Sequence, residues 1–314
     1  MSERVSIVIV NWNGAEDLEV ALPSLRAQSY PDLEIVVADN GSIDDSEQVA
    51  RAHEVVWHPL GENRGLAPAL NEGARRARGD VLLFLNNDMR FAPDYVERAV
   101  EVLLSDRDIA AVGTCQLDWD GNVGVHERTR LRPARWPRGD VPGWEFAQEP
   151  ASAPCDCLFA SAADLLIRRV DFEALGGWDD AFTLSWEDVD LCWRIWAAGH
   201  RVVHIPDAIC WHRVAAASTA TDDGSDARLH GTLYGRLRFA WKHLPAASLV
   251  VLHLLLIAGI VTDMVRSRSV ERRARTHVLG RVMRELPKLV RVRREHARPA
   301  GRSRRAFLRR LGAI

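Results

Sequence analysis

The sequence predicts an α/β fold with a Rossmann-like, mostly parallel sheet flanked by helices, followed by a basic helical tail. Strand-like and helix-like patterns alternate over the first part of the chain, which is the rhythm of a doubly wound sheet. Polar residues follow three of the predicted strands, namely Asn11, Asp39 and Asp88. Because sheets of this type bind ligands at the carboxyl ends of their strands, these residues indicate a ligand site.

The predicted strands of the first part are short and rich in β-branched residues. Val5–Val10 is such a run, and nearly continuous apolar runs are typical of parallel strands buried on both faces. Further strands are predicted at residues 34–38, 55–58 and 81–85. Helices are predicted at residues 17–28, 45–53, 66–78 and from Pro93 to about residue 104.

The second part of the chain is less regular. Residues 117–154 are rich in Pro, Gly and Trp with weak periodicity, and we interpret them as an extended insertion, either a lid or an acceptor-binding segment. Regular structure resumes with strand-like residues 157–168, a helix at 189–198 and a strand at 201–205.

Charge divides the chain into two regions. Of its 41 lysines and arginines, 20 lie in residues 236–314, whereas only 4 of its 43 aspartates and glutamates do. An acidic body with a basic tail predicts one catalytic and one attachment part, and the tail favours anionic partners, either phospholipid or nucleic acid. Residues 246–262 are almost wholly apolar but fall short of the about 20 residues of a full membrane span. The rest of the tail looks amphipathic, and the alternative is a solvated appendage used for oligomerisation.

The cysteines predict a reducing compartment. There are five, an odd number, and no C-x-x-C pair of the kind that binds metals. The first residues lead straight into a strand-like run, with no secretory signal. We therefore expect reduced thiols in a protein on the cytoplasmic side.

Two acidic strand ends can be interpreted in two ways. Asp39 can accept a hydrogen bond from the ring N–H of a uracil or thymine base, or it can bond its own turn. Asn86-Asn87-Asp88 offers one carboxylate and two amides, which suit a hard divalent cation that keeps several waters and shares a diphosphate. A turn is again the alternative. His212 joins such a metal site only if the fold brings it back to Asp88.

A third acidic cluster lies at a predicted helix start, where Glu187, Asp188 and Asp190 fall within four positions. Acids at a helix N-terminus complement the helix dipole, which is the structural interpretation. The surrounding aromatic and apolar residues favour a second one, because a carboxylate in an apolar pocket has a raised pKa and can act as a general base.

Taken together, these segments resemble the inverting glycosyltransferase family 2, which has the GT-A fold, and within it the bacterial rhamnosyltransferase-type members. Any single piece is weak, but the ordered set from about Val5 to Ser218 is specific. The matching stretches are Val5–Gly14, Ala38–Ser42, Glu62–Ala67 with Asn71, Leu85–Asp88, Gly176–Asp179, Trp186–Arg194 and Ile205–Asp207 through His212.

The resemblance implies a role for each matching position. Asp188 would be the general base, with Glu187 beside it, and Asp88 with His212 would bind Mg²⁺ or Mn²⁺. The implied donor-binding residues are Asn11, Asp39, Asn40, Arg64, Asn86 and Asn87. The implied acceptor-binding residues are Trp178, Asp179 and Trp186. Asn86 departs from the family pattern, because it replaces the first acid of the D-x-D motif, which predicts weaker metal binding.

The resemblance also implies an organisation. Residues 1–225 would form the GT-A domain, with a nucleotide-sugar half at 1–112 and an acceptor half at 113–225, and residues 226–314 would associate with a membrane. The implied reaction is an inverting transfer to a hydroxyl of a glycan or lipid-linked acceptor in cell-envelope polysaccharide synthesis, at the cytoplasmic face of the cell membrane. By subfamily the expected donor is dTDP-rhamnose, with UDP-galactofuranose or another UDP-hexose as alternatives.

Three rival functions fit less well. A nucleotidyltransferase would need a phosphate-binding loop after the first strand, which Asn11–Gly14 does not supply. A nucleic-acid-binding protein would use the Arg-rich tail, but few aromatic residues there suit base stacking and the acidic body repels phosphate. A catalytically dead relative is disfavoured because Asp39, Asp88 and Asp188 are all present. We therefore expect no nucleic-acid partner.

Overall fold

A computed structural model describes residues 3–126, 128–135, 139–182, 184–213, 222–266 and 269–296. The strands are β1 (Val5–Asn11), β2 (Leu33–Asp39), β3 (Val56–Pro59), β4 (Val81–Asn86), β5 (Met89–Phe91), β6 (Ile109–Leu117), β7 (Val123–His126), β8 (Arg128–Pro133), β9 (Trp144–Glu149), β10 (Cys155–Asp156), β11 (Asp164–Arg168) and β12 (Arg201–His212). The helices are α1 (Ala15–Arg26), α2 (Ser46–Ala52), α3 (Leu66–Arg76), α4 (Tyr95–Ser105), α5 (Arg169–Ala174), α6 (Glu187–Ala198), α7 (Asp222–His243), α8 (Ala246–Val265) and α9 (Ser269–His296).

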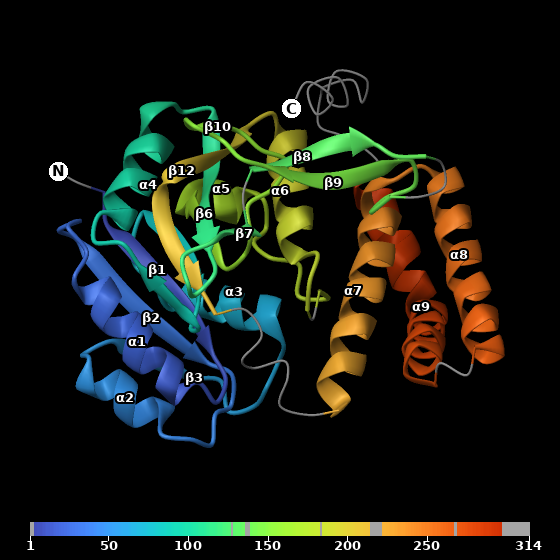
Figure 1. The fold of residues 1–314 in the computed structure, drawn as a ribbon, viewed down its shortest axis with the longest axis horizontal. Coiled ribbons are helices and arrows are strands. Elements are labelled where there is room, and N and C mark those ends of the chain that lie inside the picture. The colour runs from blue at the N-terminus through green and yellow to red at the C-terminus, as the bar shows by residue number, and fades with distance from the viewer. Residues whose placement is uncertain are drawn as a thin grey trace.

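One large sheet organises the first two-thirds of the chain (Figure 1). Its order is β10-β12-β6-β11-β4-β1-β2-β3, and β1 runs parallel to both β2 and β4. Strand β11 is antiparallel to its neighbours β4 and β6, so the sheet is mixed at this point. The mostly parallel α/β architecture predicted from the sequence is confirmed.

Two layers of helices cover the sheet, and each buries its own apolar cluster. Helices α1 and α4 contribute Leu18, Leu22 and Tyr95 to the cluster on one face. Helices α3, α5 and α6 contribute residues such as Leu70 and Trp196 to the cluster on the other. Strands β1, β2 and β4 are buried on both faces, which explains why they have no alternating polar pattern.

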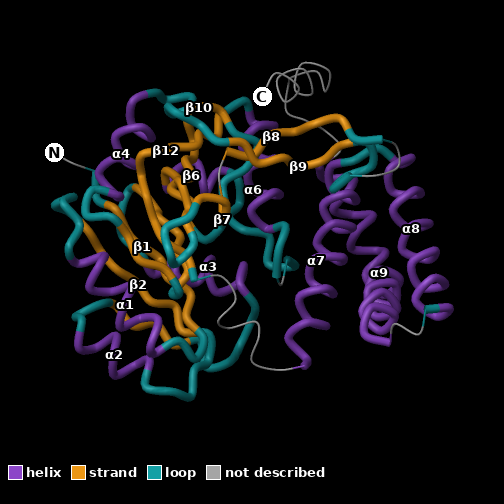
Figure 2. The backbone as a smooth tube through the Cα atoms, viewed as in Figure 1, coloured by secondary structure: helices purple, strands orange, loops and turns teal. Residues whose placement is uncertain are grey.

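The second part differs from prediction at several points. The segment 117–154 contains β7 and the separate two-stranded sheet of β8 and β9, which appears beside α6 and α7 in Figure 2. The strand-like residues 157–168 form a strand only from Asp164 onward. Strand β12 extends to His212, well beyond the predicted 201–205, with a register shift between Ile205 and Ile209.

The tail forms three helices that lie beside the sheet domain, with α8 outermost in the view of Figure 1. Helices α7, α8 and α9 share an apolar cluster that includes Tyr234, Leu252 and Val282. In the described part of the chain, α8 is the helix that is long and apolar enough to cross a membrane. The arginine-rich residues 297–314 of the predicted tail lie outside the described residues.

Candidate functional site

Three strands end side by side and bring their polar residues to one edge of the sheet. Asn11 at the end of β1 pairs in register with Asp39 at the end of β2, and Val10 pairs with Asn86 at the end of β4. The Asn11 amide then joins the strand ends, because its Nδ2 donates to Asp39 Oδ1 at 3.2 Å and its Oδ1 accepts from Asn87 Nδ2 at 2.8 Å. The predicted clustering of strand-end residues is therefore found in the structure.

Asp39 is almost fully buried and partly engaged by its own turn. Its Oδ2 accepts the backbone N–H of Ser42 at 3.0 Å, which is the turn bond considered from the sequence. The next residue, Asn40, holds the loop beyond β3, since its Oδ1 accepts the backbone N–H of Arg64 at 2.8 Å. The Arg64 guanidinium donates to the Leu60 carbonyl at 3.0 Å and its side chain is 41% exposed. Contact of Arg64 with a donor stays a prediction.

Asp88 and His212 meet although they are far apart in the sequence. Strand β12 pairs with β5 and sets His212 opposite Met89, so that His212 Nε2 lies 3.1 Å from Asp88 Oδ1. Asn86 Nδ2 lies 3.4 Å from the same nitrogen. On the far side of the ring, His212 Nδ1 is 3.0 Å from Gln116 Oε1. Sequence reasoning missed Gln116, whose only signal was its position on a neighbouring strand.

This arrangement fits a divalent cation. With its proton on Nδ1 and donated to Gln116, the imidazole turns the lone pair of Nε2 toward the carboxylate of Asp88, a contact that a cation between them would relieve. The 3.1 Å separation suits two adjacent octahedral ligands, which are about 3 Å apart when each is about 2.1 Å from the metal. Within the described residues there is no group of three or more His, Cys, Asp and Glu side chains suited to a metal. The protein would thus supply few ligands.

Glu187 and Asp188 open helix α6 from a strained turn. Ser185 and Trp186, just before them, have φ angles of 79° and 75°, a left-handed conformation that is uncommon outside glycine. Burial raises the pKa of Asp188 to about 6, against the hydrogen bonds that it accepts from the backbone of Val189 and Ala162. Burial and the neighbouring Asp188 charge raise the pKa of Glu187 to about 8. At neutral pH the pair therefore carries mainly one negative charge, on Asp188.

A short path of backbone hydrogen bonds connects Asp188 with the strand end that leads to Asp88. The carboxylate of Asp188 accepts from the Ala162 backbone, and the carbonyl of the following residue, Ala163, accepts the backbone N–H of Asn86 at 3.3 Å. Asp188 is thus tied to the end of β4, the strand that leads into Asp88.

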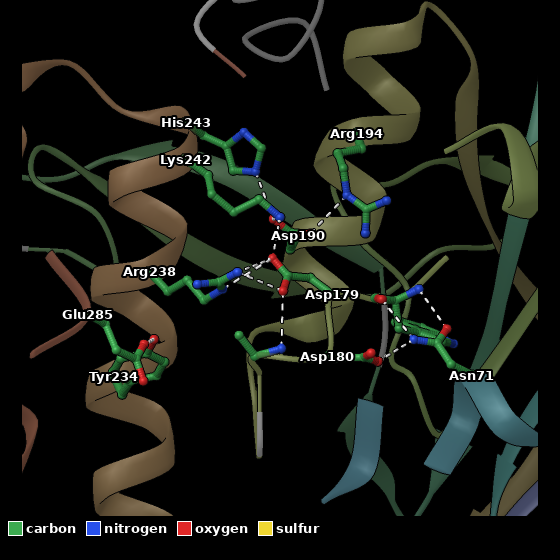
Figure 3. Close-up of polar contacts among 12 residues, drawn as sticks. Asn71, Asp179, Asp180, Asp190, Arg194, Tyr234, Arg238, Lys242, His243 and Glu285 are labelled. Carbon is green, nitrogen blue, oxygen red and sulfur yellow. Dashed lines mark hydrogen bonds and ion pairs between the residues drawn. The ribbon is translucent and has the colours of Figure 1, made fainter. Parts of the chain in front are cut away.

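The three predicted acceptor-binding residues are mostly buried. Trp178 is 2% exposed and packs edge-on against Phe84, and Trp186 is 7% exposed and contacts Phe239 of α7. Asp179 forms ion pairs with two cations of α7 (Figure 3). Contact of these side chains with an acceptor stays a prediction; their visible role is to support the segment between α5 and α6.

Comparison with known proteins agrees with this geometry. The model of "Glycosyl transferase family 2" matches residues 6–174. N-acetylglucosaminyl-diphospho-decaprenol L-rhamnosyltransferase of Mycobacterium tuberculosis is 28% identical over 258 residues, which cover 73% of this chain and 82% of the relative. Poly-beta-1,6-N-acetyl-D-glucosamine synthase of Staphylococcus aureus is 24% identical over 220 residues, which cover 67% of this chain and half of the synthase.

Two solved structures share the fold. GalNAc-T7 with UDP, GalNAc and Mn²⁺ superposes with a TM-score of 0.60 at 19% identity, over 76% of this chain and 48% of that protein, so the chain spans about half its length. The mannosyltransferase PcManGT from Pyrobaculum calidifontis, in complex with GDP-Man and Mn²⁺, has a TM-score of 0.55 at 19% identity, over 100% of this chain and 80% of that protein.

Proposed function

Because the chain belongs to glycosyltransferase family 2 and has the GT-A fold, we propose that it transfers L-rhamnose from dTDP-rhamnose to a hydroxyl of a lipid-linked glycan. That it is a glycosyltransferase is the premise; the donor sugar, the acceptor and the residue roles are the proposal. The donor rests on the rhamnosyltransferase relative. A UDP-hexose is the second candidate, since another relative is named as a synthase of poly-beta-1,6-N-acetyl-D-glucosamine, a polymer of a hexose derivative.

The observation that carries the mechanism is the buried Asp188, fixed by the Ala162 backbone beside the strand end that leads to Asp88. Its pKa of about 6 leaves it ionised at neutral pH yet basic enough to accept a proton. We assign it the proton of the acceptor hydroxyl. As that oxygen forms its bond to the anomeric carbon, the bond from this carbon to the nucleoside diphosphate breaks, and the product has inverted configuration.

The donor would lie across the strand ends. Asp39 would accept the ring N–H of the nucleobase, with Asn11 and Asn40 fixing the surrounding loops. Asp88 and His212 would hold Mn²⁺ or Mg²⁺, which both solved GT-A structures contain as Mn²⁺, and the ion would neutralise charge on the departing diphosphate. Asn87, held by Asn11, lies at the same edge.

Attachment to the cytoplasmic face of the cell membrane is the second part of the proposal. Helix α8 has two apolar faces: Leu249, Leu252 and Leu256 are buried in the helical cluster, whereas Val250, Leu254 and Val261 are largely exposed. Since positions 250, 254, 257, 261 and 264 share one side of a helix, the exposed face forms a continuous apolar stripe. An interfacial helix of this kind, beside the arginines of α9, suits an anionic lipid surface.

A donor screen tests the enzymatic proposal. Purified protein is incubated with dTDP-rhamnose, UDP-galactofuranose and UDP-hexoses, with Mg²⁺ or Mn²⁺ and a polyprenyl-diphosphate glycan, and released nucleoside diphosphate is measured. The expected result is transfer from dTDP-rhamnose, with an inverted anomeric centre by NMR and with loss of transfer but not of donor binding in Asp188→Asn. Retained configuration, or near-normal turnover of Asp188→Asn, would contradict the proposed mechanism.

A further inference from the structure

One face of helix α7 lies directly against the segment that leads into the general base. Gly231, Gly235, Arg238 and Lys242 are spaced by four, three and four residues and so share one side of the helix. The two glycines lie so close to Leu184, Ser185 and Trp186 that an added Cβ would meet them, and the two cations contact acids on either side of this segment. Nothing in the sequence of α7 alone indicates this, because its partners lie far away in the chain.

The glycines allow a close approach of two backbones. A Cβ on Gly231 would lie 2.6 Å from the carbonyl oxygen of Leu184, and a Cβ on Gly235 would lie 2.7 Å from that of Ser185. Both distances are too short for a side chain unless the backbone moves. Ser185 and Trp186 are the left-handed residues of this turn, and such a conformation persists only where the surroundings hold it in place.

The cations fix both flanks of the turn (Figure 3). Arg238 makes a two-pronged contact with Asp179, through Nη2 to Oδ1 at 2.8 Å and Nε to Oδ2 at 3.1 Å. Lys242 Nζ lies between two acids, 2.7 Å from Asp179 Oδ2 and 2.6 Å from Asp190 Oδ1. His243 Nε2 also contacts Asp190 Oδ1, at 2.8 Å.

These contacts lie on both sides of Asp188 in the sequence. Asp190 is two residues further along α6, and the turn 185–186 ends just before Glu187. Phe239, between Arg238 and Lys242 in sequence, packs against the rings of Trp186 and Trp193. Any shift of α7 would therefore move the first turn of α6, and Asp188 with it.

We propose that α7 is a positioning element of the transfer site, which seats the turn 184–186 and holds Asp188 in the orientation that removes the acceptor proton. The inference rests on the proposed function, because it takes Asp188 as the general base. It assigns the first helix of the basic tail to the catalytic unit, and it gives Asp179 and Asp190 the role of anchors for that helix.

Acidic and basic side chains from both α6 and α7 lie around this turn. Glu187 faces Asp188 and Asp190. Burial alone would raise the pKa of Asp190, but Arg194 of α6 with Lys242 and His243 of α7 outweigh burial and hold it well below its ordinary value. A displaced turn would admit water to Asp188, and the loss of burial would lower its pKa.

The decisive variant is Gly235→Ala, with Gly280→Ala of α9 as the matched control, since a Cβ at Gly280 meets no atom within 4 Å. In Gly235→Ala, kcat should fall about 10- to 100-fold while the KM for the donor stays within about twofold. The acidic limb of the kcat–pH profile should move to lower pH, and amide hydrogen exchange in 184–190 should accelerate. The control should match the wild type in all three measurements.

Phe239→Leu makes the same test without placing a new atom against the turn, and it is expected to change kcat and hydrogen exchange in the same direction. A kcat, a pH profile and an exchange rate equal to the wild type in both variants would overturn the inference. The exchange measurement needs no substrate, so α7 can be tested even if every donor fails. Wild-type protein that transfers none of the donors would contradict the proposed function, and unchanged exchange in 184–190 would contradict the role of α7.

Discussion

Replacing Glu187 with glutamine separates the roles of the two carboxyls that open α6. Burial raises the pKa of Asp188 to about 6, and burial with the adjacent Asp188 charge raises that of Glu187 to about 8. Between these values Asp188 is ionised and Glu187 is protonated. Because glutamine resembles protonated glutamate in size and in its lack of charge, Glu187→Gln should keep kcat at pH 7 within about tenfold of the wild type. Asp188→Asn should lower kcat at pH 7 by about 10²- to 10⁴-fold.

The pH dependence follows from the same values. Wild-type kcat should fall about tenfold for each pH unit below 6, as Asp188 takes up a proton. The free energy of unfolding should change in the opposite direction and decrease as pH rises. A buried carboxyl with a raised pKa favours the folded state most below its unfolded pKa, near 4.5 for Glu187, and this contribution is lost as pH rises through 8. At about 1.4 kcal/mol per pH unit between the two pKa values, the loss is on the order of a few kcal/mol.

The assay is kcat from pH 5 to 9 at saturating donor and acceptor, with urea unfolding at pH 5 and pH 9. Glu187→Gln should be more stable than the wild type at pH 9, and the difference should nearly vanish toward pH 5. Glu101→Gln, on the exposed side of α4, controls for the substitution itself. If Glu187→Gln lost its activity and Asp188→Asn kept it, Glu187 and not Asp188 would be the general base. A wild-type kcat that is flat from pH 5 to 8 would refute the reasoning altogether.

Three further predictions concern the metal, the membrane and the donor. In a metal titration, His212→Ala should raise the Mn²⁺ concentration for half-maximal activity at least about tenfold, and Gln116→Leu should raise it about tenfold. Titration curves equal to that of the wild type would show that Asp88 and His212 do not bind the ion. The double variant Leu254→Glu/Val261→Glu should weaken flotation with anionic liposomes, and a chain ending at residue 244 should not float. Unchanged flotation would show that α8 does not contact the membrane. Asp39→Ala should raise the donor KM much more than it lowers kcat, as measured by steady-state kinetics, because uniform binding is lost.

The sheet and the polar edge where its strands end could be predicted because their signals are local. Strands β1, β2 and β4 are buried on both faces and therefore read as apolar runs, and parallel strands necessarily end at one edge. The sequence alone could thus place Asn11, Asp39 and Asp88 at the same edge. The contact of His212 with Asp88 could not be predicted from local signals, because it depends on the antiparallel pairing of β12 with β5.

The environment of the proposed general base, Asp188, could not be predicted, because it is built from contacts distant in sequence. Arg238 and Lys242 lie 59 and 63 residues from Asp179, and no local pattern connects them. Aromatic residues were ambiguous for a related reason. Trp178 and Trp186 suit either an acceptor site or a core by residue type, and their packing against Phe84 and Phe239 could not be predicted from the sequence. The hairpin of β8 and β9 was missed because its strands are largely polar, and most of their residues are half-buried or exposed.

The buried ion pairs argue for including α7 with the transfer domain rather than with the tail. The side chains of Asp190 and Lys242 are 0% and 2% exposed, so removing α7 would leave Asp190 buried with Arg194 as its remaining cation in this cluster. Removing one partner of a buried pair costs about 3–5 kcal/mol, a large part of the 5–15 kcal/mol that stabilises a typical domain. A boundary at residue 225, as the family resemblance implied, would separate α7 from these partners. Since α8 begins three residues after His243, the apolar stripe proposed to contact lipid is joined through α7 to the turn that carries Asp188.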